Sequence, residues 1–360
     1  MHLRLIWLLL LFPILILGQE IDSLQDHIDL GIYPAISYTP ETNLSFGAFA
    51  LMVLKNKSNP KHYTPNLISP KMAYSLNNQL ILGLEGSFFT QKNRRINAEI
   101  KYSDYPDYFF GIGNANNPKI KELYKRQFMS TQGYVMKGIT STLFAGALFD
   151  FDYSVLKDLI PSGMLNQEDP QGIRGGRSAG AGIGLTFDDR DHLLYPRKGK
   201  FIQVGARWYG SIIGSDYQYQ HFFFDYRQYQ TFFSDQRVLA FQLSAQFNQG
   251  NIPFYKLSKL GGKDYLRGVD NANLYTAQHS FYGQIEGRQH LFWRLGGVLF
   301  AGIGDVFDQL KELDVEHLKI NYGIGGRFQA LKEQSLNIRL DLGFTNNGQS
   351  AIYFSIKEAF

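Results

Sequence analysis

Apolar and polar residues alternate along most of this chain in short segments. The clearest example is segment 237–249, where Leu239, Phe241 and Leu243 alternate with polar or small residues such as Gln242. Successive side chains of a β-strand point to opposite faces of a sheet. Each such segment therefore predicts a strand with one apolar face and one polar face.

Segment 335–344 carries charged residues on its polar face. Leu336 and Ile338 lie on one side, whereas Arg339 and Asp341 lie on the other. Charged side chains are unusual in the core of a soluble barrel, but they are expected in the wet lumen of a transmembrane barrel whose apolar face contacts lipid. A soluble β-sandwich with its polar face outward is the alternative. The charged face favours the membrane fold.

The alternation predicts about sixteen strands. Single-chain bacterial barrels have an even number of strands, so the expected fold is all-β, an antiparallel transmembrane β-barrel of about sixteen strands. The predicted strands are 30–39, 44–54, 64–76, 80–90, 96–105, 128–137, 139–151, 178–188, 200–210, 217–229, 237–249, 278–290, 295–306, 318–330, 335–344 and 351–360. With both termini in the periplasm, the long connections share the extracellular side, and these are 106–127, 152–177, 250–277 and 307–317. The turn at 189–199 is a longer one on the periplasmic side.

The first and last predicted strands must pair to close the barrel. Pro34 lies in the first strand, and because proline has no N–H to donate to a ladder, it belongs at a sheet edge. A weak seam follows, which is either a short terminal strand or an opening toward lipid. In the last strand an apolar row is expected to face lipid, and it consists of Ile352, Phe354, Ile356 and Phe360. The opposite row contains Tyr353, Ser355, Lys357 and Ala359.

The N-terminal residues have the form of a secretory signal peptide. Arg4 supplies a positive charge, residues 5–17 are apolar, and Gly18 is a small residue at the expected cleavage site. No later apolar run approaches the roughly 20 residues that a transmembrane helix needs, so an exported membrane protein must be a barrel. The expected division of the chain is signal peptide 1–18, short periplasmic lead 19–29 and barrel 30–360.

Composition narrows the function classes. Aromatic residues make up 15% of the chain and there are 36 glycines, a mixture typical of strands, tight turns and membrane-interface belts. The absence of cysteine excludes disulfides, thiolate metal sites, cysteine nucleophiles and lipoprotein acylation. The eight histidines show no metal-ligand spacing, so no metal or cofactor is expected. The net charge of +4 is scattered, which argues against a nucleic-acid partner.

An enzyme is not expected. A lipid-facing hydrolase needs a serine and a histidine close together on one wall. His279 and Ser280 are neighbours in the sequence, so their side chains point to opposite faces of a strand and cannot pair directly.

A long loop before the twelfth predicted strand contains a short motif. Leu266, Arg267 and Gly268 match the Arg-Gly-aromatic motif of the Omp85 superfamily, with Val269 in place of the aromatic residue. In this loop the chain resembles the BamA/TamA-type barrels, also called the bacterial surface antigen D15 type. The resemblance implies that the loop folds back into the lumen.

Glu286 is the expected partner of Arg267. It lies on the inward face of the twelfth strand with Gln284 and Arg288, and in related barrels an acidic residue at the matching position accepts the loop arginine. An arginine inside a barrel must be paired or hydrated. The alternative is that Arg267 lies free in an outer loop.

Three further segments resemble the same family. Phe300 and Gly304 match a family pattern on the thirteenth strand, whereas Gly302 stands where the family carries an aspartate and offers room instead. Residues 186–191 are similar to the family's turn after strand eight, and residues 353–360 are similar to its C-terminal assembly signal. The resemblance covers the whole predicted barrel.

The resemblance implies a role in assembling or inserting outer-membrane proteins, or in translocating a substrate, through the seam. Omp85 proteins usually carry periplasmic POTRA modules before the barrel, and residues 19–29 are too few for one, so a barrel lacking POTRA domains is expected. The alternative is a non-catalytic channel or membrane scaffold that partners a separate periplasmic protein. The expected location is the outer membrane of a Gram-negative bacterium, with lipid and other outer-membrane or periplasmic proteins as partners.

Overall fold

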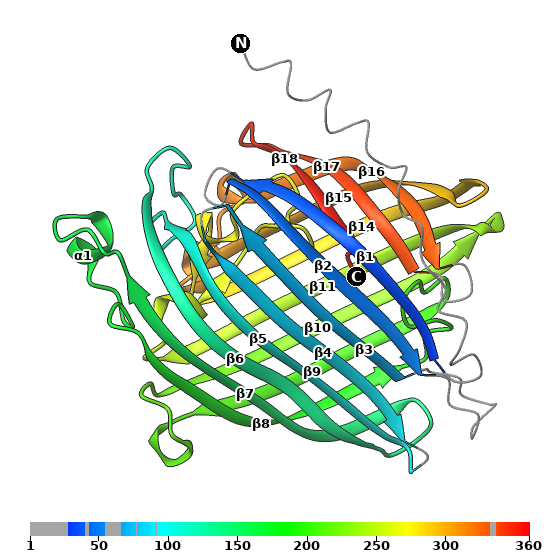
Figure 1. Cartoon of the computed structure of the whole chain (residues 1–360), viewed down its shortest axis with the longest axis horizontal. Helices are drawn as coiled ribbons and strands as arrows, with labels where there is room; N and C mark the ends of the chain where they lie inside the picture. Colours follow the sequence, from blue (N-terminus) through cyan, green and yellow to red (C-terminus); the bar gives the residue numbers. More distant parts are fainter. Residues whose placement is uncertain (1–27, 40–42, 55–65, 77, 91, 332–335) are drawn as a thin grey trace.

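Sixteen antiparallel strands form one sheet that winds into a barrel (Figure 1). The computed structural model describes residues 28–39, 43–54, 66–76, 78–90, 92–331 and 336–360. The expected signal peptide, and the lead up to residue 27, lie outside the described residues. The strands of the barrel are β1 Ile28–Thr39, β2 Asn43–Leu54, β3 Asn66–Ser75, β4 Leu80–Thr90, β5 Arg94–Phe109, β6 Glu122–Gly138, β7 Leu143–Lys157, β8 Gly176–Asp188, β9 Gly199–Tyr209, β10 Tyr219–Phe232, β11 Ser234–Gly250, β14 His279–Phe292, β15 Leu295–Phe307, β16 Lys319–Leu331, β17 Leu336–Thr345 and β18 Ser350–Ile356.

The strands are two-faced, as their alternation predicts. On β11, Leu239 and Phe241 are 43% and 40% exposed on the outer face, whereas Ala240 and Gln242 are buried on the inner face. The predicted number of strands and their antiparallel order are confirmed. No helix in the described part of the chain is long and apolar enough to cross a membrane.

Some strand boundaries differ from the prediction. Residues 139–142 form a turn, in which the Thr140 Oγ1 accepts a hydrogen bond from the Leu143 amide, so β7 begins four residues later than expected. β5 continues through Pro106 to Phe109, because Phe109 packs edge-on against Phe254 inside the barrel. The loop between β5 and β6 is correspondingly shorter than predicted.

The last strand ends earlier than predicted. β18 stops at Ile356, and Lys357 adopts the left-handed conformation with φ 67°, which turns the chain into the lumen. Phe360 is therefore buried against Tyr229 and Ala240. The prediction that residues 351–360 form one strand with Phe360 facing lipid is wrong, because the inner wall supplies an apolar contact for this ring. The Ile356 side chain lies outside the described residues.

Because the strands alternate in direction, β1 begins and β18 ends at one end of the barrel, the terminal end. The four connections that were predicted to be long share the opposite end, the loop end, and in the structure they are 110–121, 158–175, 251–278 and 308–318. The 158–175 connection contains the short helix α1 Met164–Glu168. Among the described strands, none of the ladders joins β1 to β18, so the expected seam lies between them.

Candidate functional site: the lumen segment and the seam

Residues 251–278, the lumen segment, fold back into the barrel (yellow in Figure 1). They contain the 3-10 turns η3 Phe254–Lys256 and η4 Ala272–Leu274, and a two-stranded sheet of β12 Ser258–Lys259 and β13 Thr276–Ala277. An apolar cluster fixes the segment to the inner wall, and its buried members are Phe110, Leu260, Leu266, Val269, Leu274, Tyr275, Ala277, Tyr282 and Val306. The lumen segment therefore packs as a core element.

Arg267 lies at the centre of this packing with no exposed surface. Its Nη2 lies 2.5 Å from Glu286 Oε1 on β14, and its Nη1 donates to Asp341 Oδ2 on β17 at 2.9 Å. Its guanidinium carbon also lies 3.6 Å from the ring centroid of Phe300 on β15. The expected contact between Arg267 and Glu286 is present, and Arg267 thereby connects three strands of the wall.

Asp341 is the partner that sequence reasoning missed. Gly302 stands where the family carries an aspartate, and here Asp341 on β17 gives Arg267 its second carboxylate. The signal was available, because Asp341 lies on the polar face of its strand, but alternation cannot show which lumen residue meets which. Glu286 also holds Arg288, 2.8 Å away, and Asp341 also holds Arg327. These buried charges form one network.

Gly268 and Tyr353 fix the backbone beside Arg267. Gly268 has φ 124°, and a Cβ there would lie 3.0 Å from the backbone of Phe344, so only glycine fits. The Tyr353 hydroxyl accepts from the Gly268 amide at 3.0 Å and donates to the Val269 carbonyl at 2.7 Å. Tyr353, expected to belong to a terminal assembly signal, thus anchors the loop motif from the inner face of β18.

The glycines of β15 leave room for the inner wall to pack. A Cβ at Gly302 would lie 2.3 Å from the hydroxyl of Tyr282, which donates to Asn321 at 3.0 Å. A Cβ at Gly304 would lie 2.4 Å from the backbone carbonyl of Phe281 on β14. Asn321 in turn donates to the Arg267 carbonyl at 3.0 Å. The room at Gly302 therefore supports the same loop motif.

Side chains connect the two sides of the seam. Lys357 Nζ lies 3.2 Å from the carboxylate of Glu85 on β4, three strands beyond β1. An apolar group, the seam cluster, adds a second connection at the terminal end. Its buried members are Tyr33 on β1, Leu51 and Val53 on β2, Leu67 on β3, Leu194 in the 189–198 turn and Leu336 on β17.

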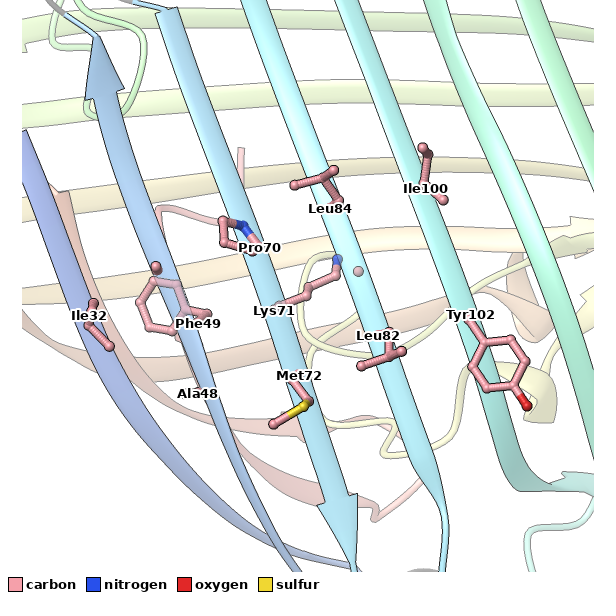
Figure 2. Close-up of a pocket in the computed structure, with 12 residues that line it drawn as sticks. Ile32, Ala48, Phe49, Pro70, Lys71, Met72, Leu82, Leu84, Ile100 and Tyr102 are labelled. Atoms are coloured by element: carbon pink, nitrogen blue, oxygen red, sulfur yellow. The ribbon is translucent and has the colours of Figure 1, made fainter. Parts of the chain in front are cut away.

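The wall beside the seam has an interrupted ladder. The β1–β2 ladder runs unbroken through Pro34, but the β2–β3 ladder lacks a pair at Pro70, which has no N–H to donate, and at the preceding Ser69. A shallow groove of about 540 Å³ lies on the outer face here. Figure 2 shows Pro70 on β3 between Ala48 on β2 and Leu84 on β4, which all line the groove. The β1–β2 hairpin is thus held to β3 by eight residue pairs, fewer than the twelve that join β1 to β2.

Comparisons with known proteins agree with this architecture. A family model described as the Omp85 superfamily domain matches residues 49–360. BamA from Haemophilus ducreyi lacking POTRA domains 1-3 is similar with a TM-score of 0.60 and 13% identity, over 91% of this chain and 70% of that chain.

Two CdiB structures are also similar. CdiB from Acinetobacter baumannii has a TM-score of 0.57 and 11% identity, over 91% of this chain and 65% of that chain. CdiB from Escherichia coli has a TM-score of 0.61 and 9% identity, over 91% of this chain and 62% of that chain. At such identities the likeness shows the fold alone, and this chain spans less than two thirds of either CdiB chain. A comparison with curated proteins found no match.

Proposed function

Because the chain belongs to the Omp85 superfamily, we propose that it is an outer-membrane barrel that assembles other outer-membrane proteins, or passes a secreted substrate, through the seam between β1 and β18. In this proposal the terminal end faces the periplasm, and residues 1–18 direct export. Outer-membrane lipid surrounds the barrel, and outer-membrane or periplasmic proteins are its clients or helpers.

The observation that carries the proposal is the seam. Every other neighbouring pair of barrel strands shares a ladder, whereas β1 and β18 do not pair in the described part of the chain. An unpaired strand edge in lipid is costly, and it is a template on which another strand can pair. A client strand that adds to β1 or β18 would satisfy these backbone groups.

Two features support a seam that opens and closes. The β2–β3 interruption at Pro70 leaves the β1–β2 hairpin with fewer ladder bonds to the rest of the wall. Side-chain contacts, such as Lys357 with Glu85, cost less to break and remake than a continuous ladder. In this proposal the firmly packed lumen segment meanwhile narrows the pore.

Depletion in the native host tests the proposal. After depletion of this chain, the amounts of other barrels in the outer-membrane fraction and of secreted proteins in the medium are measured together. Loss of one class identifies the client. Unchanged amounts of both classes would contradict the proposal and favour a scaffold or channel for a separate periplasmic protein.

A further inference from the structure

Residues 357–360, the inward segment, leave β18 and occupy a site built by five other strands of the wall. The segment begins at the left-handed Lys357, whose amide donates to the Asn337 carbonyl at 2.9 Å. Glu358 contacts β16 and β17, whereas Phe360 contacts β10, β11 and β14. The segment is therefore held in the lumen by side chains of other strands, in the way that a bound peptide is held by its binding site.

The site has a position for a carboxylate. Glu358 Oε2 lies 2.8 Å from Arg327 Nε, and Glu358 Oε1 accepts from Asn337 Nδ2 at 2.8 Å. Arg327 is only 5% exposed and also pairs with Asp341, so Glu358 is the second carboxylate that this buried guanidinium holds. Burial disfavours the charged carboxylate, but the neighbouring Arg327 and Arg288 outweigh this effect and hold the pKa of Glu358 below its ordinary value.

The site also has a position for an aromatic residue two places further on. The Phe360 ring is 5% exposed and packs against Tyr229, with ring centroids 6.3 Å apart, and against Val238 and Ala240. Arg288 lies over the ring at 5.2 Å from its centroid and donates to the main-chain oxygen of Phe360 at 3.1 Å. The site thus contacts both the side chain and the main chain of Phe360.

A cavity gives this site an entrance. A space of about 280 Å³ is lined by Arg327 and Asn337, the two residues that hold Glu358, and also by Arg197 and Arg294. The strands and turns that line it meet at the terminal end. Its arginines favour an acidic ligand, and Asp235 is the carboxylate among its lining residues.

We infer that the barrel has a binding site for short peptide segments in which an acidic residue precedes an aromatic residue by two positions, and that residues 357–360 occupy this site until a client segment displaces them. The inference rests on the proposed function for the source of the ligand. Displacement would also separate Lys357 from Glu85 and so loosen the seam. The peptide site thereby couples client binding to seam opening.

Peptide binding to the purified full chain tests this inference. The probe is a fluorescein-labelled peptide with the sequence of residues 355–360, and the control peptide carries glutamine and alanine in place of its glutamate and phenylalanine. The variant Glu358→Gln with Phe360→Ala weakens the occupant without shortening the chain. In fluorescence anisotropy, this variant should bind the probe at least tenfold more tightly than the natural chain does, and at least tenfold more tightly than it binds the control peptide.

Two further variants locate the binding. Arg327→Gln, added to the weakened variant, should reduce probe affinity at least tenfold, whereas Arg177→Gln at the loop end should leave it unchanged. Folding of each variant is checked by its mobility on unboiled gels. A folded weakened variant that fails to bind the probe, or that binds both peptides equally, overturns the inference. Because the assay needs no client, its result is independent of the depletion experiment.

Discussion

Lys357 and Glu85 are 272 positions apart in the sequence, yet the Lys357 ammonium lies 3.2 Å from both carboxylate oxygens of Glu85. Lys357 follows the last strand and Glu85 lies on the fourth, so the contact crosses the seam that no ladder closes. Both side chains are about one-third exposed, so the ion pair alone contributes little stability. Its importance is its position, since it joins the two sides of the barrel where the backbone does not.

A cysteine pair at these positions should lock the seam. The natural chain has no cysteine, so Lys357→Cys with Glu85→Cys provides one defined pair for a short bifunctional methanethiosulfonate reagent, which joins the two thiols through reducible disulfides. We expect cross-linking to abolish client assembly or secretion and reduction of the cross-link to restore it. The matched control is Arg177→Cys with Asp216→Cys, a pair 2.9 Å apart at the loop end that does not cross the seam. Equal loss of function in both cross-linked proteins would contradict the prediction.

Arg267→Ala should release the lumen segment. The change leaves Glu286 and Asp341 without a shared partner, and breaking a buried ion pair costs about 3–5 kcal/mol in a dry site. The expected results are a higher conductance in planar bilayers, greater sensitivity to large antibiotics and a lower free energy of unfolding. Arg177→Ala removes only an exposed ion pair. It should leave the conductance and the antibiotic sensitivity unchanged, and it should alter the free energy of unfolding by no more than about 1 kcal/mol. An unaltered conductance of Arg267→Ala would show that the segment is held without this residue.

Leu51→Ala should weaken the seam cluster. Leu51 is 1% exposed, and removing a buried leucine side chain typically costs about 2–5 kcal/mol because a cavity remains. Denaturant unfolding in detergent measures the loss, and current fluctuations in a planar bilayer report seam opening. Leu239→Ala serves as the control, since Leu239 is 43% exposed on the outer face and its loss should cost far less. Similar losses for both variants would argue against a role for the cluster.

Pro70→Ala should repair the β2–β3 ladder. Alanine supplies the N–H that proline lacks, and one added hydrogen bond is worth about 0.5–1.5 kcal/mol. Amides of β2 near Ala50 should exchange with solvent more slowly, and client assembly should slow because the β1–β2 hairpin is held more firmly. Pro34→Ala is the comparison, because the β1–β2 ladder already runs unbroken through Pro34. Faster amide exchange in Pro70→Ala would refute the prediction.

The alternation of apolar and polar residues in the sequence was sufficient to predict the strands of the barrel and the direction in which their side chains point. Alternation along β11 and β17 determined which side chains face outward, because the strand period of two leaves no other choice once one face must be apolar. The same parity put Glu286 on the inner face, and the family motif supplied Arg267 as its partner, so this contact could be expected from sequence. A sheet of sixteen such strands in a membrane must then curve into a barrel, because a free sheet edge in lipid is costly.

Only the tertiary structure decided what meets inside that frame. Parity places Asp341 on an inner face but does not show that Arg267 lies against it, since that depends on how a 28-residue segment packs back into the lumen. The direction of Phe360 could not be read from sequence either, because a lysine, not a glycine, makes the left-handed turn at Lys357. Local pattern fixes the face of a side chain, whereas contacts between distant residues are chosen by packing over the whole barrel.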